Sequence, residues 1–336
     1  MGSARHVPHI AKYIKPDIMV IRYVTSRRML MGVPIITTGD ASVIDAFYDT
    51  DPNRRLGIVT CAGGNRNAKT AGAFISLRQR KLTDRPDAFA GVSSGIATTG
   101  FFMGRGIAPD VKVFSDDMSD RRMFDLRRRF RGRYPFDVDY VERVFRGIET
   151  GRGIRAHVAV SHGSPLYAVL GDAITGEPII RKPADAEDLW TLASYGTAVT
   201  GFARPLTYQG QAVTDGYFTV QQLPVEWLVE NEQLTDVLVF AGGDYDPQPQ
   251  LSHWSEHALY ASGIASATGP IRDLIRTRNI RFMETADRIV QLPHVRVLMV
   301  WVPERLSPLN IKKEKSRALV RLGYQTMEAL FRQRHL

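Results

Sequence analysis

The chain has 336 residues, of which 44% are hydrophobic and 24% are charged, so global disorder is excluded and a well-buried core is expected. Its 44 Lys and Arg residues outnumber its 35 Asp and Glu residues, and the formal charge of +9 favours anionic partners such as phospholipid head groups, nucleic acid or acidic small molecules. The single cysteine, Cys61, excludes an internal disulfide framework and a zinc site built from cysteines, and its place in an apolar run predicts a buried structural thiol.

The first part of the chain lacks a clear hydrophobic period. Residues 1–54 are therefore interpreted as an N-terminal extension, and residues 55–336 as one α/β domain, because no Pro/Gly/Ser-rich linker divides them. The opening "MGSARHVPHIAKYIKP" has no apolar core and no cleavage pattern, so a secretory signal is not expected. Within the extension, a strand is predicted over 17–24 and a short helix over 41–49.

Residues 56–104 read as strand, glycine loop, helix, strand, sharp turn and helix. This alternation is typical of a parallel sheet with crossover helices. The later segments continue the α/β pattern. Strands are predicted over 157–163, 166–172, 235–243 and 294–303, and helices over 186–201, 226–233 and 311–333.

An arginine-rich segment follows at 121–133, with apolar residues among its cations. Its basic residues are Arg121, Arg122, Arg127, Arg128, Arg129, Arg131 and Arg133. The plainest interpretation is a solvated helix face whose arginines pair with nearby carboxylates, namely Asp116, Asp117, Asp120 and Asp125. A lid, or a peripheral contact with an anionic membrane surface, is the main alternative. A nucleic-acid patch is the remaining alternative, and no nucleic-acid partner is expected.

The peptide "GVSSG", from Gly91 to Gly95, matches the G-x-S-x-G pattern at the end of a predicted strand and before a predicted helix. This is the context of a nucleophile elbow, in which small flanking residues permit a sharp turn that exposes the central serine. Ser93 is thus the candidate nucleophile, and Ser94 is interpreted as its neighbour. A plain Gly/Ser turn is the alternative.

The loop "GGNRNAKT" at 63–70 follows the preceding predicted strand. It differs from the phosphate-binding pattern G-x-x-x-x-G-K-[ST] at Ala68 only, so an NTPase loop that uses Lys69 is one interpretation. The other is an oxyanion hole, in which the backbone amides of Gly63, Gly64 and Asn65 stabilise a tetrahedral intermediate.

Asp215-Gly216 follows a short apolar run and could face the serine. An aspartate in hydrogen-bond reach of a serine can accept the hydroxyl proton directly, whereas Asp-Gly on its own is a common turn. A Ser–His–Asp triad could instead recruit His162, His253 or His257, and "HWSEH" could suggest a metal pair, although a structural role is favoured for each histidine.

Taken together, three motifs resemble the patatin-like phospholipases. "AGGNRNAKTAG", in which Gly72 lies six residues after Arg66, is similar to that family's G-G-G-x-R-G loop and helical glycine; "GVSSG" is similar to its G-x-S-x-G, and "TDGYF" to its D-G-G/A. The resemblance implies a three-layer α/β/α fold with a mainly parallel central sheet. It also implies a dyad of Ser93 and Asp215, an oxyanion hole at Gly63, Gly64 and Asn65, and an Arg66 that shapes the loop or meets a lipid phosphate.

Two positions of the loop differ from the family pattern. Ala62 and Asn67 stand where the family has glycine. The alanine requires a negative φ at position 62, and asparagine at position 67 is compatible with left-handed backbone.

The resulting expectation is a serine acyl hydrolase that cleaves phospholipids or lysophospholipids without a metal or organic cofactor. Its expected location is the cytoplasm, with peripheral membrane contact through 121–133 as a further option. The alternatives are a non-catalytic lipid-binding or regulatory protein, a soluble carboxylesterase or thioesterase, and a P-loop NTPase.

Overall fold

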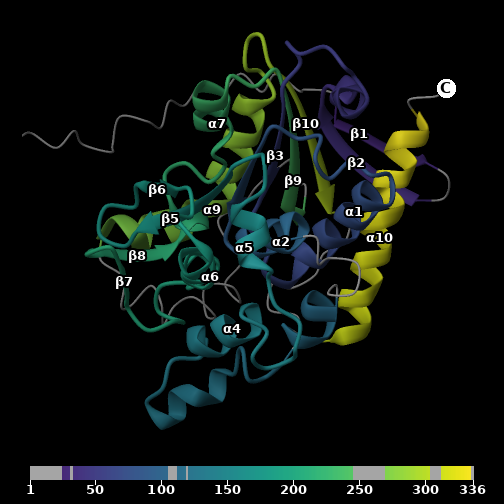
Figure 1. Cartoon of the computed structure of the whole chain (residues 1–336). Coiled ribbons are helices and arrows are strands. Elements are labelled where there is room, and N and C mark those ends of the chain that lie inside the picture. The colour runs from purple at the N-terminus through teal and green to yellow at the C-terminus, as the bar shows by residue number, and fades with distance from the viewer. Residues whose placement is uncertain are drawn as a thin grey trace, which may run out of the picture.

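A computed structural model describes residues 25–30, 33–104, 112–118, 120–244, 269–302 and 312–333. The middle of its sheet consists of five mutually parallel strands (Figure 1), which in spatial order are β10 (Arg296–Val302), β9 (Asp236–Asp244), β3 (Leu56–Thr60), β4 (Ala88–Val92) and β5 (Leu166–Asp172). Antiparallel strands flank them: β1 (Thr25–Leu30) and β2 (Val33–Gly39) beside β10, and β6 (Pro178–Arg181), β8 (Gln211–Asp215) and β7 (Leu206–Tyr208) beyond β5. The expectation of a mainly parallel central sheet is confirmed.

The parallel strands are buried on both faces, as their near-continuous apolar sequences require. Along β3, Leu56 and Ile58 belong to one apolar cluster and Val59 to the other, because successive side chains point to opposite faces. Helices on both sides cover these clusters (Figure 1). One face packs against α1 (Ala68–Gln79), α2 (Ser94–Met103), α6 (Ala186–Tyr195) and α10 (Lys313–Gln333), and the other against α7 (Val225–Glu232) and α9 (Gly269–Ile289). The predicted α/β/α layering is therefore present.

Short helices fill the connections: η2 (Ala41–Phe47), η3 (Gly64–Asn67), η4 (Val113–Asp117), η5 (Leu126–Arg131), α4 (Val138–Phe145), α5 (Ala156–Val160) and η6 (Gly216–Phe218). The predicted strand over 157–163 is wrong, since this segment contributes to α5. The buried side chains of Ala156 and Ala159 explain the difference, because their spacing of three residues gives this short helix one buried face. Of the described helices, none combines the length and the apolar character that crossing a membrane requires.

Part of the N-terminal segment belongs to the sheet. β2, which lies within residues 1–54, pairs with β10, and the indole of Trp301 donates to the hydroxyl of Thr38 at 3.0 Å. The helix predicted over 41–49 is present as the 3₁₀ helix η2. The strand predicted over 17–24 lies outside the described residues.

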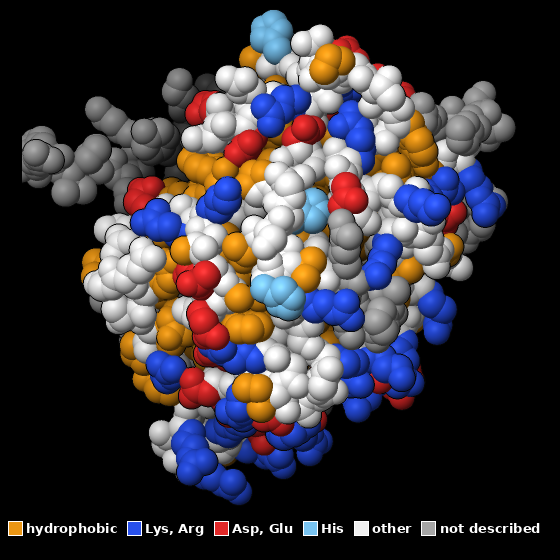
Figure 2. Space-filling model, in the orientation of Figure 1, with side chains coloured by type: hydrophobic (Ala, Val, Ile, Leu, Met, Phe, Trp, Pro, Cys, Tyr) orange, Lys and Arg blue, Asp and Glu red, His pale blue; other side chains and the backbone are white. Residues whose placement is uncertain are grey.

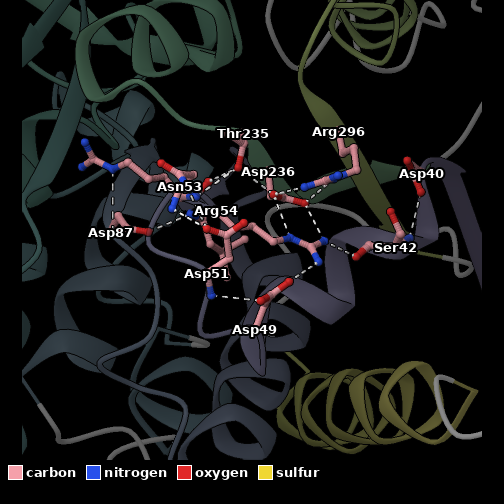
Figure 3. A network of polar contacts seen from close by, with 12 residues as sticks. Asp40, Ser42, Asp49, Asp51, Asn53, Arg54, Asp87, Thr235, Asp236 and Arg296 are labelled. Carbon is pink, nitrogen blue, oxygen red and sulfur yellow. Dashed lines mark hydrogen bonds and ion pairs between the residues drawn. The ribbon is translucent and has the colours of Figure 1, made fainter.

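A buried ion cluster joins the start of the parallel sheet to the segment before β3 (Figure 3). The carboxylate of Asp236, at the first residue of β9, accepts hydrogen bonds from Arg54 at 3.0 and 3.2 Å and from Arg296 at 2.8 Å on each oxygen. Burial alone would raise the pKa of Asp236, but the two guanidinium groups and Thr235 outweigh burial and hold the pKa below its usual value. The carboxylate is thus ionised and fully paired.

Helices α1 and α10 cross at a pair of glycines. A Cβ atom at Gly72 would lie 1.9 Å from the carbonyl oxygen of Val320, and one at Gly323 would lie 1.8 Å from that of Lys69. The two backbones therefore touch, which accounts for the helical glycine that follows the 63–70 loop.

Candidate active site

Ser93 occupies a sharp turn between β4 and α2. Its backbone has φ 56° and ψ −133°, a combination that a residue with a Cβ rarely adopts. The flanking glycines make the turn sterically feasible: a Cβ at Gly91 would lie 2.6 Å from the Cα of Ile96, and one at Gly95 would lie 2.2 Å from the carbonyl oxygen of Thr60. This backbone geometry is compatible with the nucleophile elbow that the sequence predicts.

The structure places Ser93 and Asp215 in direct contact. The hydroxyl of Ser93 donates to Oδ2 of Asp215 at 2.7 Å, and the backbone amide of Tyr217 donates to Oδ1 at 2.8 Å. Asp215 is the last residue of β8, which pairs with β5, and β5 lies beside the strand that precedes Ser93. Both side chains are buried. Two residues that lie far apart in the sequence thus form one hydrogen-bonded pair.

Burial dominates the electrostatics of this pair. It raises the pKa of Asp215 to about 7, while the hydrogen bonds from Ser93 and from the Tyr217 amide act in the opposite direction. A carboxylate with such a pKa is a stronger base than an exposed one, and it can be both ionised and protonated near neutral pH.

The 63–70 loop lies at the carboxyl end of β3 and reaches the same cavity. Gly63 packs against Gly242 at the end of β9, so closely that a Cβ on Gly63 would lie 2.9 Å from the Gly242 Cα. Gly64 has φ 52°, which favours glycine, and it opens the short helix η3. Gly63, Gly64, Asn65 and Arg66 line the cavity together with Ser93 and Asp215.

Asn67 ties the loop to the elbow. Its side-chain amide donates to the carbonyl oxygen of Cys61 at 2.9 Å and to the hydroxyl of Ser94 at 2.6 Å, and its amide oxygen accepts from the hydroxyl of Thr70. Its backbone has φ −66° and ψ −7°, so the left-handed conformation considered for this position is not used. The hydrogen bonds of its side chain explain the asparagine at this position. At Ala62 the backbone φ is negative, as an alanine requires.

A cavity of about 150 Å³ opens above the Ser93–Asp215 pair. Apart from the motif residues, its lining is largely apolar and comes from Met118, Met123, Phe124, Phe136, Val199, Phe202, Tyr217 and Phe218, with Arg278 and Asn279 from α9. The walls of the cavity could not be predicted from the sequence. No motif marks them, although Phe124 within the arginine-rich segment and Phe136 just after it are a visible signal.

Other residues with predicted chemistry lie elsewhere. Lys69 is buried and donates to the carbonyl of Trp301, and it is not among the described residues that line the cavity, which disfavours a phosphate-binding loop. His162 lies 3.1 Å from Asp84, at the end of β4 opposite Ser93. His253 and His257 fall outside the described residues. Cys61 is buried as predicted, and burial raises its pKa to about 12.

The arginine-rich segment is not one continuous helix. It contains a turn and the 3₁₀ helix η5, which spans Leu126–Arg131. Two of the predicted carboxylate partners form ion pairs with arginines of the segment, Asp120 with Arg122 and Asp125 with Arg127. The other two pair with cations outside it, Asp116 with Arg317 and Asp117 with Arg152.

Comparisons with known proteins find distant structural likeness only. No protein-family model and no curated protein sequence matches the chain. Among solved structures, the chain is similar to VipD from Legionella pneumophila, at 10% identity and a TM-score of 0.42 over 94% of this chain and 72% of that one. It is also similar to ExoU, seen with SpcU of the Pseudomonas aeruginosa type III secretion system, at 11% identity and a TM-score of 0.30 over 86% of this chain and 64% of that one. A second ExoU–SpcU structure matches at 12% identity with a TM-score of 0.27, over 95% and 68% of the two chains.

Proposed function

We propose that the chain is a patatin-like serine acyl hydrolase that cleaves fatty-acyl esters of lipids. The observation that carries this proposal is the buried 2.7 Å hydrogen bond between the Ser93 hydroxyl and Asp215, beneath an apolar cavity. The strained elbow at Ser93 supports it, because strain of this kind is typical of functional sites.

In the proposed mechanism, the ionised carboxylate of Asp215 accepts the proton of Ser93 as Oγ attacks the ester carbonyl carbon. The backbone amides at Gly63, Gly64 and Asn65 stabilise the negative charge that develops on the carbonyl oxygen. The tetrahedral intermediate then collapses, and the leaving alcohol takes the proton from Asp215. Water attacks the acyl-serine with Asp215 again as base, and the fatty acid and the free serine hydroxyl are released.

The proposed substrates are phospholipids or lysophospholipids. The phenyl and methionine side chains of the cavity wall suit an acyl chain, because burying apolar surface is favourable at about 25 cal/mol per Å². Arg66 lines the same cavity and would meet the phosphate or shape the loop. Neither a metal nor an organic cofactor takes part in these steps.

A soluble carboxylesterase is the second candidate, and one observation favours it. The cavity of about 150 Å³ is smaller than the ~300–1,000 Å³ of typical ligand pockets, which suits a short acyl chain. Hydrolysis of an ester series of increasing chain length separates the two candidates. Rates that rise towards long chains support the lipid hydrolase, and rates that fall beyond short chains support the esterase.

The test of the proposed function is fatty-acid release from mixed phospholipid micelles by the unmodified protein, Ser93→Ala and Asp215→Asn. We expect turnover by the first and a loss of about 10³-fold or more in both variants, with folding retained. Fluorophosphonate should label the unmodified protein and not Ser93→Ala. Turnover that survives in Ser93→Ala would refute the mechanism. A protein that neither turns over substrate nor reacts with fluorophosphonate would be a non-catalytic lipid-binding or regulatory protein.

A further inference from the structure

A projection formed by residues 124–136 extends from the body below α4 (Figure 1). Phe124 and Phe136 pair across its base, and the amide of Asp125 donates to the carbonyl of Pro135 at 3.0 Å. The helix η5 lies between them, followed by Gly132 with a left-handed φ of 66°. The projection is thus a closed loop with a defined base and a free end.

The free end carries apolar side chains in solvent. The side chain of Phe130 is 92% exposed, which is the highest exposure among the large hydrophobic residues described. Leu126 and Tyr134 in the same projection are 43% and 47% exposed. Since burying a phenylalanine side chain is favourable, this exposed apolar group points to an apolar phase that covers it.

Cations surround this apolar end. Arg131 and Arg133 are exposed, and within the described ranges neither forms an ion pair. Arg127 and Arg128 are paired, with Asp125 and Asp137 respectively. Blue side chains gather along the lower edge of the molecule in Figure 2, where the projection lies in Figure 1. The free end therefore combines an exposed aromatic ring with net positive charge.

The base of the projection forms part of the cavity wall. Met123, Phe124 and Phe136 all line the cavity above Ser93. Phe202 fixes this base to the body, because its carbonyl accepts the Phe136 amide at 2.9 Å and its ring lies edge-on to Phe124 at 5.7 Å. Arg129 adds a hydrogen bond to the carbonyl of Gly201 at 2.8 Å. The projection thus joins the free end to residues that line the cavity above Ser93.

We propose that this projection docks the protein on an anionic lipid surface, with Phe130 inserted at the level of the acyl chains and Arg131 and Arg133 among the head groups. The proposal rests on the proposed function, because the docked lipid is then the source of the substrate. A lipid surface fits better than a protein partner because the feature is a narrow convex end. A bilayer can close around such an end, whereas a stable protein interface needs about 800 Å² on each partner.

The test measures vesicle partitioning of the full chain in the Ser93→Ala background, so that hydrolysis does not alter the lipid. The probes are phosphatidylcholine vesicles with and without phosphatidylglycerol. We expect binding to anionic vesicles that weakens with salt, a fall of about tenfold in Phe130→Ala, and a comparable fall when Arg131→Gln and Arg133→Gln are combined. Phe130→Trp should retain binding and show quenching by lipids brominated in the acyl chain.

Matched controls come from exposed residues outside the projection. Ile174 is 64% exposed, and Arg181 and Lys182 are an exposed basic pair, so Ile174→Ala and the double Arg181→Gln, Lys182→Gln variant should leave partitioning unchanged. Equal loss in the controls, unchanged binding in Phe130→Ala, or no binding of the parent protein to anionic vesicles would each overturn the docking proposal. Hydrolysis of a soluble short-chain ester by the protein with Ser93 intact tests the catalytic proposal separately, since it requires no lipid surface.

Discussion

At the scale of single residues, the proposed chemistry depends on the burial of Asp215. Its carboxylate has two hydrogen-bond donors, Ser93 and the Tyr217 amide, and burial raises its pKa to about 7 in spite of them. Only the ionised carboxylate can accept the serine proton. The protonation state of one residue should therefore control the rate.

We predict that kcat/KM for a soluble ester rises with pH up to about 7 and then levels off. Below the pKa of Asp215 the rate should fall about tenfold per pH unit, because the fraction of ionised carboxylate falls by that factor. Asp84→Asn, which removes an exposed carboxylate, should leave the profile unchanged. A rate that stays constant down to pH 5 would contradict this role of Asp215.

The same titration should appear in stability. The pKa of folded Asp215 is raised above its unfolded value of 3.8, so its contribution is fully favourable below that value and is lost as pH rises through about 7. Asp215→Asn should therefore be more stable than the unmodified protein above pH 7, by ~4 kcal/mol, since each pKa unit between 3.8 and about 7 corresponds to about 1.4 kcal/mol. Denaturant unfolding at several pH values measures the difference, which should disappear near pH 4.

Site residues could be predicted from the sequence where a short local motif marks them. The positive φ of Ser93 and that of Gly64 are local requirements of the backbone, and each leaves a short glycine-containing motif. The role of Asn67 could not be read from the sequence, because its partners are Cys61 and Ser94, and Ser94 lies on another element. Its residue type suggested a backbone conformation, whereas the tertiary structure uses its side chain.

At the scale of elements, the contact between α1 and α10 connects α10 to the proposed active site. Helix α1 begins at Ala68, directly after the loop that lines the cavity, and Gly323 of α10 touches the backbone of Lys69 in its first turn. A shift of α10 away from α1 would therefore move the residues that follow the proposed oxyanion loop.

Gly323→Ala should destabilise the protein by at least ~1–3 kcal/mol and lower ester hydrolysis. An alanine Cβ would lie 1.8 Å from the Lys69 carbonyl oxygen, and this overpacking outweighs the ~1 kcal/mol by which alanine favours a helix over glycine. Thermal unfolding and kcat/KM measure the two effects. Gln325→Ala changes an exposed position of the same helix and should stay within ~0.5 kcal/mol of the unmodified protein. A Gly323→Ala protein as stable as this control would show that the helices can separate freely.

Elements differed in how well their sequences predicted them. The buried parallel strands β3, β5, β9 and β10 were predicted because continuous apolar runs are typical of them. Helix α9 was missed although Ile271, Ile275 and Phe282 lie on its buried face, since arginines interrupt the apolar pattern. The valines of helix α5 predict a strand, because its five residues are too few for a helical period to outweigh them.

At the scale of the whole molecule, the amino and carboxyl ends of the parallel strands carry different groups of residues. Ser93 and the 63–70 loop lie at the carboxyl ends of the strands, and the Asp236 cluster lies at their amino ends. Strand β9 carries Asp236 at its amino end and Gly242 near its carboxyl end, so it joins the ion cluster to the cavity. Substitutions at the amino ends should therefore change stability, and substitutions at the carboxyl ends should change activity.

We predict that Asp236→Ala lowers the free energy of unfolding by ~3–5 kcal/mol, because Arg54, whose side chain is 13% exposed, loses its buried counter-charge. Asp236→Asn should cost less, since it can still accept hydrogen bonds. Denaturant unfolding measures both variants, and the matched surface change is Glu226→Ala, which breaks a pair with a half-exposed Arg288 and should cost no more than ~1 kcal/mol.

Measurements of kcat in these variants compare the two ends of the strands. In the folded fraction of Asp236→Ala, kcat should remain close to that of the unmodified protein, because no residue of the cluster lines the cavity. Ser93→Ala should behave in the opposite way, with intact stability and no turnover. A lower kcat in fully folded Asp236→Ala would contradict this prediction. It would show that changes at the amino ends of the strands reach the proposed active site through β9.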